Sequence, residues 1–123
     1  MNIVLWIVQI LLAALFGLAG FMKATQPYDK IRTSMAWVES VTPQILKVIG
    51  VLEFLAAIGL ILPALTGILP WLTPLAGVGL VLTMIGAMLL HIQRKEYPVL
   101  GGNLVLLLLA AFVAYGRFVI EPL

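Results

Sequence analysis

Three long stretches without a charged side chain constrain this chain more than any other feature of its sequence. They cover residues 1–22, 54–90 and 97–116. A helix that crosses a bilayer needs about 20 predominantly apolar residues, so the first and third stretches hold one such helix each. The middle stretch is long enough for two helices, and Pro63 and Pro70 mark the turn that divides it.

The sequence therefore predicts an all-α membrane protein whose single domain, residues 1–123, is a bundle of four transmembrane helices. Composition agrees, because 63% of the residues are hydrophobic, 10% are charged and the mean hydropathy is +1.20. In a soluble domain about a quarter of the residues are charged. We expect the first span to be retained and not cleaved as a signal peptide, since its first positive charge comes only at Lys23. The predicted spans are Ile3–Met22, Gln44–Leu62, Trp71–His91 and Val99–Ile120.

Charge and cysteine content exclude several kinds of site. Seven Lys/Arg against five Asp/Glu give a formal net charge of +2, which is too little for a basic surface that binds nucleic acid. Without cysteine the chain has no disulfide, no thiolate nucleophile and no Cys-ligated metal centre. With a single histidine we expect no metal site, and the glycines form no nucleotide-binding motif.

Basic residues gather beside two of the three expected connections. Cytoplasmic loops carry an excess of Lys and Arg, so connections 23–46 and 92–98 are predicted to be cytoplasmic and both termini to lie outside. Arg117 falls on the other side, where we interpret it as a flank of the last span. The basic residues of the predicted cytoplasmic side are Lys23, Lys30, Arg32, Lys47, Arg94 and Lys95.

The first of these connections contains an amphipathic pattern. Ile31, Met35 and Val38 recur at helical spacing between polar residues, which predicts an interfacial amphipathic helix between the first two spans. Trp37 in this segment, and Trp71 at the start of the third span, are expected to anchor the chain at headgroup depth. The alternative for the connection is a partly ordered cytoplasmic loop.

Glu53 stands near the middle of the second predicted span. A charged side chain at the centre of a membrane helix costs about 2.5–3.5 kcal/mol on insertion scales, so its presence needs a reason. Gly50, Ala56 and Ala57 share its helix face, and small residues let another helix approach closely. Glu53 is therefore expected to face protein, either as a proton carrier or ligand contact, or as a protonated or ion-paired residue that fixes helix packing.

Three more polar residues are expected in the same half of an up-down bundle. Lys23 ends the first span, His91 ends the third, and Asn103 lies about one turn inside the fourth. With Glu53 they form a candidate ligand-binding cluster, in which His91 could pair with Glu53 or relay its proton. Taken singly, Lys23 fits a cytoplasmic flank, His91 an interfacial residue and Asn103 a packing hydrogen bond.

Small residues recur on two spans at the spacing of a helix contact. We expect the first and third spans to pack tightly through them, and Gln9 to hydrogen-bond a neighbouring residue. The small residues are Ala13, Gly17 and Gly20 on the first span and Gly79, Thr83 and Gly86 on the third.

Short segments spread over almost the whole chain carry a family resemblance. They are Ala19–Lys23, Trp37–Glu39, Gly50–Glu53, Gly59–Pro74, His91–Tyr97, Asn103 and Tyr115–Phe118. By their order and spacing the chain resembles the DoxX-like family of small four-span membrane proteins, which implies a four-helix bundle in the bacterial inner membrane. In the wider DoxX group, some members are quinone-linked subunits of sulfur-oxidising enzymes and others belong to redox-stress complexes. A related branch includes a chaperone for the assembly of neuronal acetylcholine receptors.

Three functions stay open on this basis, and the resemblance assigns no catalytic residue. The first is a non-catalytic assembly or accessory subunit that acts through helix–helix contacts with a second copy or a partner membrane protein. The second is a quinone-linked oxidoreductase subunit that depends on a redox partner, with the quinone at the polar cluster in the cytoplasmic half of the bundle. The third is transport of a proton or small solute by an oligomer. Apart from the quinone of the second hypothesis no cofactor is expected, and whether the protein is an enzyme is left open.

Overall fold

The computed structural model describes the backbone of all 123 residues and every side chain except that of Ser34. In this part of the chain four spans are long and apolar enough to cross a membrane, which confirms the predicted all-α bundle. The first three are α1 (Asn2–Thr25), α3 (Pro43–Thr66) and α4 (Leu72–Gln93). The fourth, Tyr97–Ile120, consists of the 3₁₀ turn η2 (Tyr97–Val99), α5 (Leu100–Tyr115) and the π-helical turn η3 (Gly116–Ile120).

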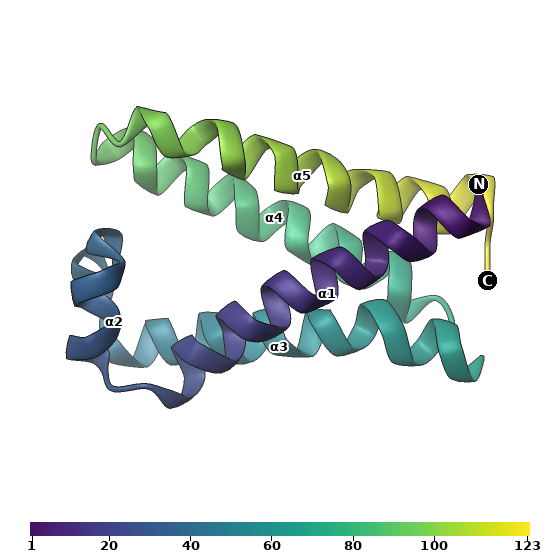
Figure 1. The fold of residues 1–123 in the computed structure, drawn as a ribbon, viewed down its shortest axis with the longest axis horizontal. Helices are drawn as coiled ribbons and strands as arrows, with labels where there is room; N and C mark the ends of the chain where they lie inside the picture. Colours follow the sequence, from purple (N-terminus) through teal and green to yellow (C-terminus); the bar gives the residue numbers. More distant parts are fainter.

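The four spans are arranged as two pairs. Helix α1 packs against α3, and α4 forms an antiparallel hairpin with α5 (Figure 1). Both chain termini lie at one end of the bundle, here called the terminal end. The short helix α2 (Tyr28–Ser34), the 3₁₀ helix η1 (Ala36–Ser40) and the connection between α4 and α5 lie at the opposite end, here called the loop end. The two connections that the charge pattern assigns to one side of the membrane therefore share one end of the molecule.

The backbones of α1 and α3 touch at two glycines. A Cβ atom on Gly20 would lie 2.5 Å from the carbonyl oxygen of Gly50, and one on Gly50 would lie 2.6 Å from the amide nitrogen of Ala24. A side chain at either position would therefore push the two helices apart. Lys23 and Glu53 meet at this crossing, because a Cβ on Gly50 would lie 2.8 Å from the Cβ of Lys23 and one on Gly20 would lie 3.1 Å from the Cβ of Glu53.

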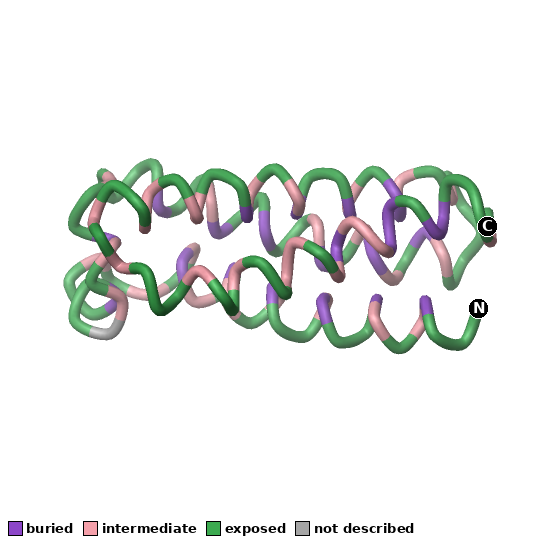
Figure 2. The backbone as a smooth tube through the Cα atoms, turned by 90° about the horizontal axis from the view of Figure 1, so that it is seen from above, coloured by how far each residue is buried: buried purple, intermediate pink, exposed green. Residues whose placement is uncertain are grey.

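Apolar side chains of all four spans fill the centre of the bundle, and the buried positions lie on the inward faces of the helices (Figure 2). The outward faces are apolar as well, because at most 28% of the most apolar 18-residue stretch of any span is buried. Lipid is the solvent that suits such a surface, so the chain is an integral membrane protein. The buried core residues are Leu12, Phe16, Leu60, Leu80, Met84, Ala110 and Val113.

The prediction that the second span ends at Leu62 is wrong, because α3 continues through Pro63. Proline has no N–H to offer the carbonyl group four residues earlier, which here belongs to Gly59. The hydroxyl of Thr73 on α4 donates to that carbonyl oxygen at 2.9 Å. A neighbouring helix thus supplies the hydrogen bond that the proline lacks. Helix α3 ends only at Thr66, and the next residue, Gly67, caps it with a left-handed φ of 73°.

The connection between α1 and α3 contains two short helical pieces instead of the single amphipathic helix that its pattern predicts. The backbone of Met35 is extended, with φ −130° and ψ 94°, and separates α2 from η1. The apolar face is nevertheless correct, since Ile31 and Val38 are buried against Leu46 of α3. The hydroxyl of Tyr28 on α2 donates to the Val38 carbonyl oxygen of η1 at 2.9 Å and joins the two pieces.

The expected tight packing through small residues is confirmed for the first span and wrong for the third. The small residues of α1 face α3, where a Cβ on Gly17 would lie 3.4 Å from the Cβ of Ala57. A Cβ on Gly79 or Gly86 of α4 would meet no atom within 4 Å, so neither glycine serves a close helix contact. Thr83 and Gly86 instead line a cavity, where small side chains leave room.

Candidate functional site

A buried ion pair joins α1 to α3 near the loop end. The Nζ of Lys23 donates to Oε1 of Glu53 at 2.7 Å. The side chain of Glu53 is 2% exposed and that of Lys23 is 11% exposed. Each charge loses hydration in this position, and the short contact offsets part of that cost. Glu53 therefore faces protein, as its small neighbours on α3 predict.

Trp37 of η1 covers this ion pair. The Nζ of Lys23 lies 5.3 Å from the centroid of the Trp37 ring, within the range of a cation–π interaction. The same ring meets the ring of His91 on α4 at 6.5 Å, with an angle of 76° between the planes. Trp37 thus connects the ion pair on α1 and α3 with the end of α4. Its expected role as an interfacial anchor stays a prediction.

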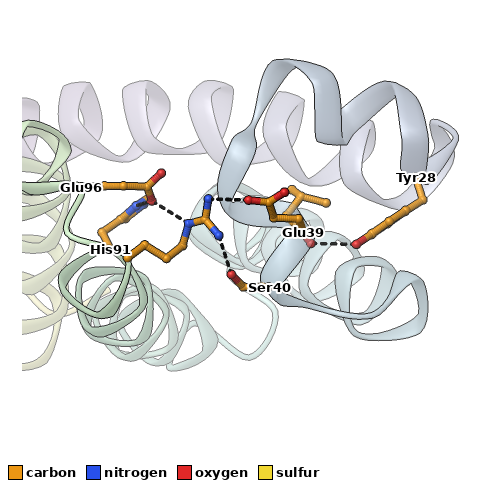
Figure 3. A network of polar contacts seen from close by, with 7 residues as sticks. Tyr28, Glu39, Ser40, His91 and Glu96 are labelled. Carbon is orange, nitrogen blue, oxygen red and sulfur yellow. Dashed lines mark hydrogen bonds and ion pairs between the residues drawn. The ribbon is translucent and has the colours of Figure 1, made fainter.

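A second polar network connects η1 with the connection between α4 and α5 (Figure 3). The Nδ1 of His91 lies 2.9 Å from Oε1 of Glu96, and the same oxygen accepts from Nε of Arg94 at 3.1 Å. On its other side Arg94 reaches η1, where Nη2 donates to Glu39 at 3.0 Å and Nη1 donates to the hydroxyl oxygen of Ser40 at 2.7 Å. One guanidinium therefore clamps two connections that are distant in the sequence.

The pKa values of two groups in this network are shifted by their partners. The hydrogen bond from His91 lowers the pKa of Glu96, and the guanidinium of Arg94 lowers it further, while desolvation acts in the opposite direction. The hydrogen bond with Glu39 raises the pKa of Arg94 above its ordinary value. At neutral pH Glu96 is therefore a carboxylate and Arg94 a guanidinium, so the clamp consists of full charges.

The ion pair of Lys23 and Glu53 and the contact of His91 with Glu96 both border a cavity of about 920 Å³. Lys23, Glu53, His91 and Asn103 all line it, so the structure brings together the four residues predicted to cluster. A volume of this size lies within the range of about 300–1,000 Å³ that is typical of ligand pockets. Apolar side chains form most of the remaining wall, among them Leu15, Phe16, Met35, Ile49, Leu52, Leu82, Met84, Leu90, Val99 and Leu106.

Asn103, on the wall of this cavity, carries an unused hydrogen-bond donor. Its Nδ2 is buried and has no hydrogen-bond partner in the part of the chain that the structure describes. A buried donor without a partner costs about 1–3 kcal/mol of folding free energy, so nearly all buried donors in native proteins are hydrogen-bonded. A ligand or water that offers an acceptor to this nitrogen would remove the cost. The predicted alternative, a packing hydrogen bond made by this nitrogen, does not occur among the described residues.

The contacts within the cluster differ from the predicted ones. His91 pairs with Glu96 and not with Glu53, whose partner is Lys23. The sequence interpretation also missed the clamp formed by Arg94 and Glu39. The available signal was opposite charge, because the two residues belong to connections predicted on the same side of the membrane. Which of several loop charges would meet was not readable from one sequence.

The arrangement offers proton-exchanging groups beside an apolar wall. Glu53, Lys23 and His91 can hold or transfer protons, and Asn103 can donate to an acceptor on a ligand. No group of three or more His, Asp or Glu side chains within the described residues is placed to hold a metal ion. The chemistry that these residues support is the recognition of a carbonyl or similar acceptor together with proton transfer.

Comparisons with known proteins agree with this architecture. The model of the DoxX-like family matches residues 7–113, a range that reaches into all four spans and contains the four polar residues at the cavity. No curated protein and no solved structure matches the chain. Since the family match covers most of the chain, the protein belongs to the DoxX-like family.

Proposed function

We propose that the protein is a membrane-embedded accessory subunit that holds a quinone, or a similar amphiphile with a carbonyl headgroup, in its 920 Å³ cavity. The observation that carries this proposal is the buried Nδ2 of Asn103, which has no partner among the described residues. A carbonyl oxygen in the cavity would accept from this nitrogen. The remaining polar residues lie on the same cavity wall and mark the end that would hold the headgroup.

The residues at the cavity fit a quinone on four counts. Asn103 supplies a donor for one carbonyl oxygen. The Nδ1 of His91 is bonded to Glu96, which leaves Nε2 for a second polar contact. The ring of Trp37 offers a flat face to a planar headgroup, and the apolar wall suits an isoprenoid chain. These features support binding by an amphiphile over binding by a fully polar solute.

Acid–base groups of the chain would serve such a ligand with protons. When bound, a quinone supplies two-electron chemistry that is coupled to protons. Glu53 and Lys23 share one short hydrogen bond at the cavity, and either can hold a proton there. The electrons would come from a redox partner, which is the reason to assign an accessory role. That partner, or a second copy of the chain, would dock on the apolar outward faces of the spans.

For its setting we propose the bacterial inner membrane, with the loop end in the cytoplasm and both termini outside. Four of the seven Lys/Arg residues belong to α2 and the connection between α4 and α5, and Lys23 and Lys47 lie in the turns of α1 and α3 next to the loop end. Basic residues favour the cytoplasmic side. The cavity, which lies near the loop end, would then occupy the cytoplasmic half of the bilayer.

Quenching of Trp37 fluorescence by a short-chain quinone tests the proposal. The chain has three tryptophans, so the double variant Trp6→Phe/Trp71→Phe leaves Trp37 as the sole reporter. We expect saturable quenching in detergent, and an apparent affinity about tenfold weaker after Asn103→Leu, because the ligand loses a buried hydrogen bond. The variant Gln93→Leu, at an exposed position on α4, is the matched control and should leave the affinity unchanged.

Quenching that rises linearly with quinone and is equal in the Asn103→Leu variant would show mere partitioning into the micelle and would contradict the proposal. Lipid extraction gives a second, independent measurement. The protein purified from its native membrane should carry quinone in excess of the detergent background, and Glu53→Gln and His91→Ala should lower that amount. Cross-linking in the membrane before purification should capture a partner protein, and its absence would oppose the accessory role.

A further inference from the structure

A second polar site lies at the terminal end of the bundle, far from the cavity proposed for a quinone. Its centre is Arg117 of η3, which is 3% exposed. The Nε donates to Oε1 of Gln9 at 2.7 Å, and Nη1 donates to Oδ1 of Asn2 at 2.8 Å and to the carbonyl oxygen of Glu121 at 3.1 Å. The guanidinium also lies 5.9 Å from the centroid of the Trp6 ring. Arg117 is thus a buried residue, and its interpretation as a membrane flank is wrong.

Gln9 explains how the guanidinium is oriented. Its side chain is fully buried, and its Nε2 donates to the carbonyl oxygen of Leu60 on α3 at 2.6 Å, which confirms the predicted hydrogen bond to a neighbour. Because the amide nitrogen is used in this way, the amide oxygen points to Arg117. The same amide therefore links three spans and directs one edge of the guanidinium.

The positive charge of Arg117 has no carboxylate in direct contact, and Glu121 acts on it only through a longer-range attraction. All three acceptors that it contacts are neutral, and among the described residues no carboxylate, the C-terminal one included, lies within 4.0 Å. Its Nη2 is buried and has no hydrogen-bond partner among those residues. Arginine keeps its proton in proteins, and a buried charge is normally paired. The Arg117 guanidinium therefore lacks a contacting anion among the described residues.

A small cavity of about 220 Å³ adjoins this guanidinium. Trp71 and Phe118 stand at its wall and are each about half exposed. Aromatic side chains in such positions are typical of the membrane interface, where phospholipid headgroups lie. The prolines of the wall offer no backbone N–H, and Arg117 is the charged hydrogen-bond donor on the wall of this cavity. The other residues of the wall are Pro70, Pro74, Pro122 and Leu123.

We propose that this cavity binds the phosphate group of an anionic phospholipid, with the unpartnered Nη2 of the Arg117 guanidinium as its recognition element. Phosphate oxygens, like carboxylate oxygens, are acceptors that form short, charge-assisted hydrogen bonds with guanidinium groups. The volume suits a headgroup phosphate and is too small for a whole lipid, whose acyl chains would lie along the apolar outer faces of the spans. The site is independent of the quinone cavity and of the function proposed there.

Native mass spectrometry of the full chain in nanodiscs tests this site. Discs that contain phosphatidylcholine with a minor share of phosphatidylglycerol should yield a species that retains one phosphatidylglycerol per chain. Arg117→Gln, which keeps hydrogen-bond donors but removes the charge, should lower that retention about tenfold. Arg117→Lys keeps a charge in case the neutral variant does not fold, and should lower it by a smaller factor. Arg32→Gln, an exposed position at the loop end, is the matched control and should retain the lipid as the parent does.

Two further measurements test whether the phosphate comes from a lipid or from solution, and whether the Glu121 carboxylate is itself the anion that Arg117 binds. Inorganic phosphate that raises the melting temperature of the parent in neutral detergent, but not that of Arg117→Gln, shows that the phosphate group alone is recognised. A rise with phosphatidylglycerol only shows that the acyl chains contribute. The proposal would be overturned if the parent and both Arg117 variants retained phosphatidylglycerol equally. Tighter retention after Glu121→Gln would also overturn it, because it would identify the Glu121 carboxylate as the missing anion.

Discussion

The ammonium group of Lys23 lies 2.7 Å from Oε1 of Glu53, at the crossing where Gly20 and Gly50 bring α1 and α3 into backbone contact. The two features depend on each other, because the side chains reach across only where the helices are this close. The glycine crossing therefore determines where in the bundle the charged wall of the large cavity lies.

Replacing Gly50 should destabilise the protein strongly. In Gly50→Ala the new Cβ would lie 2.6 Å from the Ala24 amide nitrogen, so α1 and α3 must separate, at a cost of about 1–3 kcal/mol. Denaturant titration in mild detergent, followed by circular dichroism, measures the loss. Gly102→Ala is the control, since its Cβ would meet no atom within 4 Å. A Gly50→Ala variant as stable as Gly102→Ala would contradict the close contact.

The two members of the ion pair should be coupled in stability. Glu53→Gln leaves a buried ammonium group without its partner and Lys23→Met leaves a buried carboxylate, so each single variant should lose about 3–5 kcal/mol. The double variant should lose less than the sum, because neither charge remains. The same unfolding titration completes a double-mutant cycle, and strictly additive losses would show that the two side chains do not interact.

The clamp at the loop end should open in acid. Hydrogen bonds from His91 and Arg94 lower the pKa of Glu96 from its ordinary value of 4.5. A carboxyl group with a lowered pKa in the folded state stabilises that state above the ordinary value, and this contribution is lost as the pH falls through the lowered value. In the protein with Trp37 as its sole tryptophan, fluorescence should change below about pH 4.5.

Two variants identify the group responsible for that change. Glu96→Gln should remove the acid transition, since no carboxylate remains at this point of the clamp. Asp29→Asn, at a position exposed on α2, should leave it in place. A transition that persists in Glu96→Gln would assign the acid response to another group, with Glu39 as the next candidate because it also pairs with Arg94.

The hydroxyl of Thr73 should matter only because residue 63 is a proline. Thr73→Val removes the donor to the Gly59 carbonyl oxygen, and an unpaired buried acceptor costs about 1–3 kcal/mol. In Pro63→Ala/Thr73→Val the new N–H of residue 63 can bond that carbonyl, so the second substitution should cost much less there. Thr83→Val is the control, since its hydroxyl bonds a carbonyl of its own helix. An equal cost in both backgrounds would refute this explanation.

Single cysteines can report the orientation in the membrane, because the chain has none of its own. In spheroplasts an impermeant maleimide should label Leu123→Cys at the terminal end and should reach Thr33→Cys on α2 only after the cells are opened. Both positions are exposed. The opposite labelling pattern would reverse the proposed topology.

The class of fold, and the side of α3 that faces protein, were predicted correctly from the sequence. Charge-free stretches separated by Lys, Arg and proline were sufficient for four spans, because length and apolarity alone decide whether a helix crosses a bilayer. Glu53 was expected to face protein since Gly50 and Ala57 share its side, and it does so. Local patterns of this kind are readable because they depend on the period of a single helix.

The predictions that were wrong concern residues whose contacts are with residues distant in the sequence. The helix end expected at Leu62 ignored Thr73, which bonds the carbonyl that Pro63 cannot. Arg117 was interpreted as a flank because nothing local announces Gln9 and Asn2, more than a hundred positions away. Met35, whose extended backbone divides the segment, packs against a cluster that includes Leu46 of α3, a contact that the periodicity of its own segment does not show.

By itself the sequence determined the solvent, the number of spans and the residues too polar to face lipid, since these follow from the free energy of transferring each side chain into a bilayer. Only the tertiary structure decided the partners: Lys23 for Glu53, Glu96 for His91, and no partner at all, among the described residues, for the amide nitrogen of Asn103. The reason is that pairing depends on where separate helices cross. Packing at Gly20 and Gly50 sets the crossing of α1 and α3, and the sequence alone does not show that these two glycines meet.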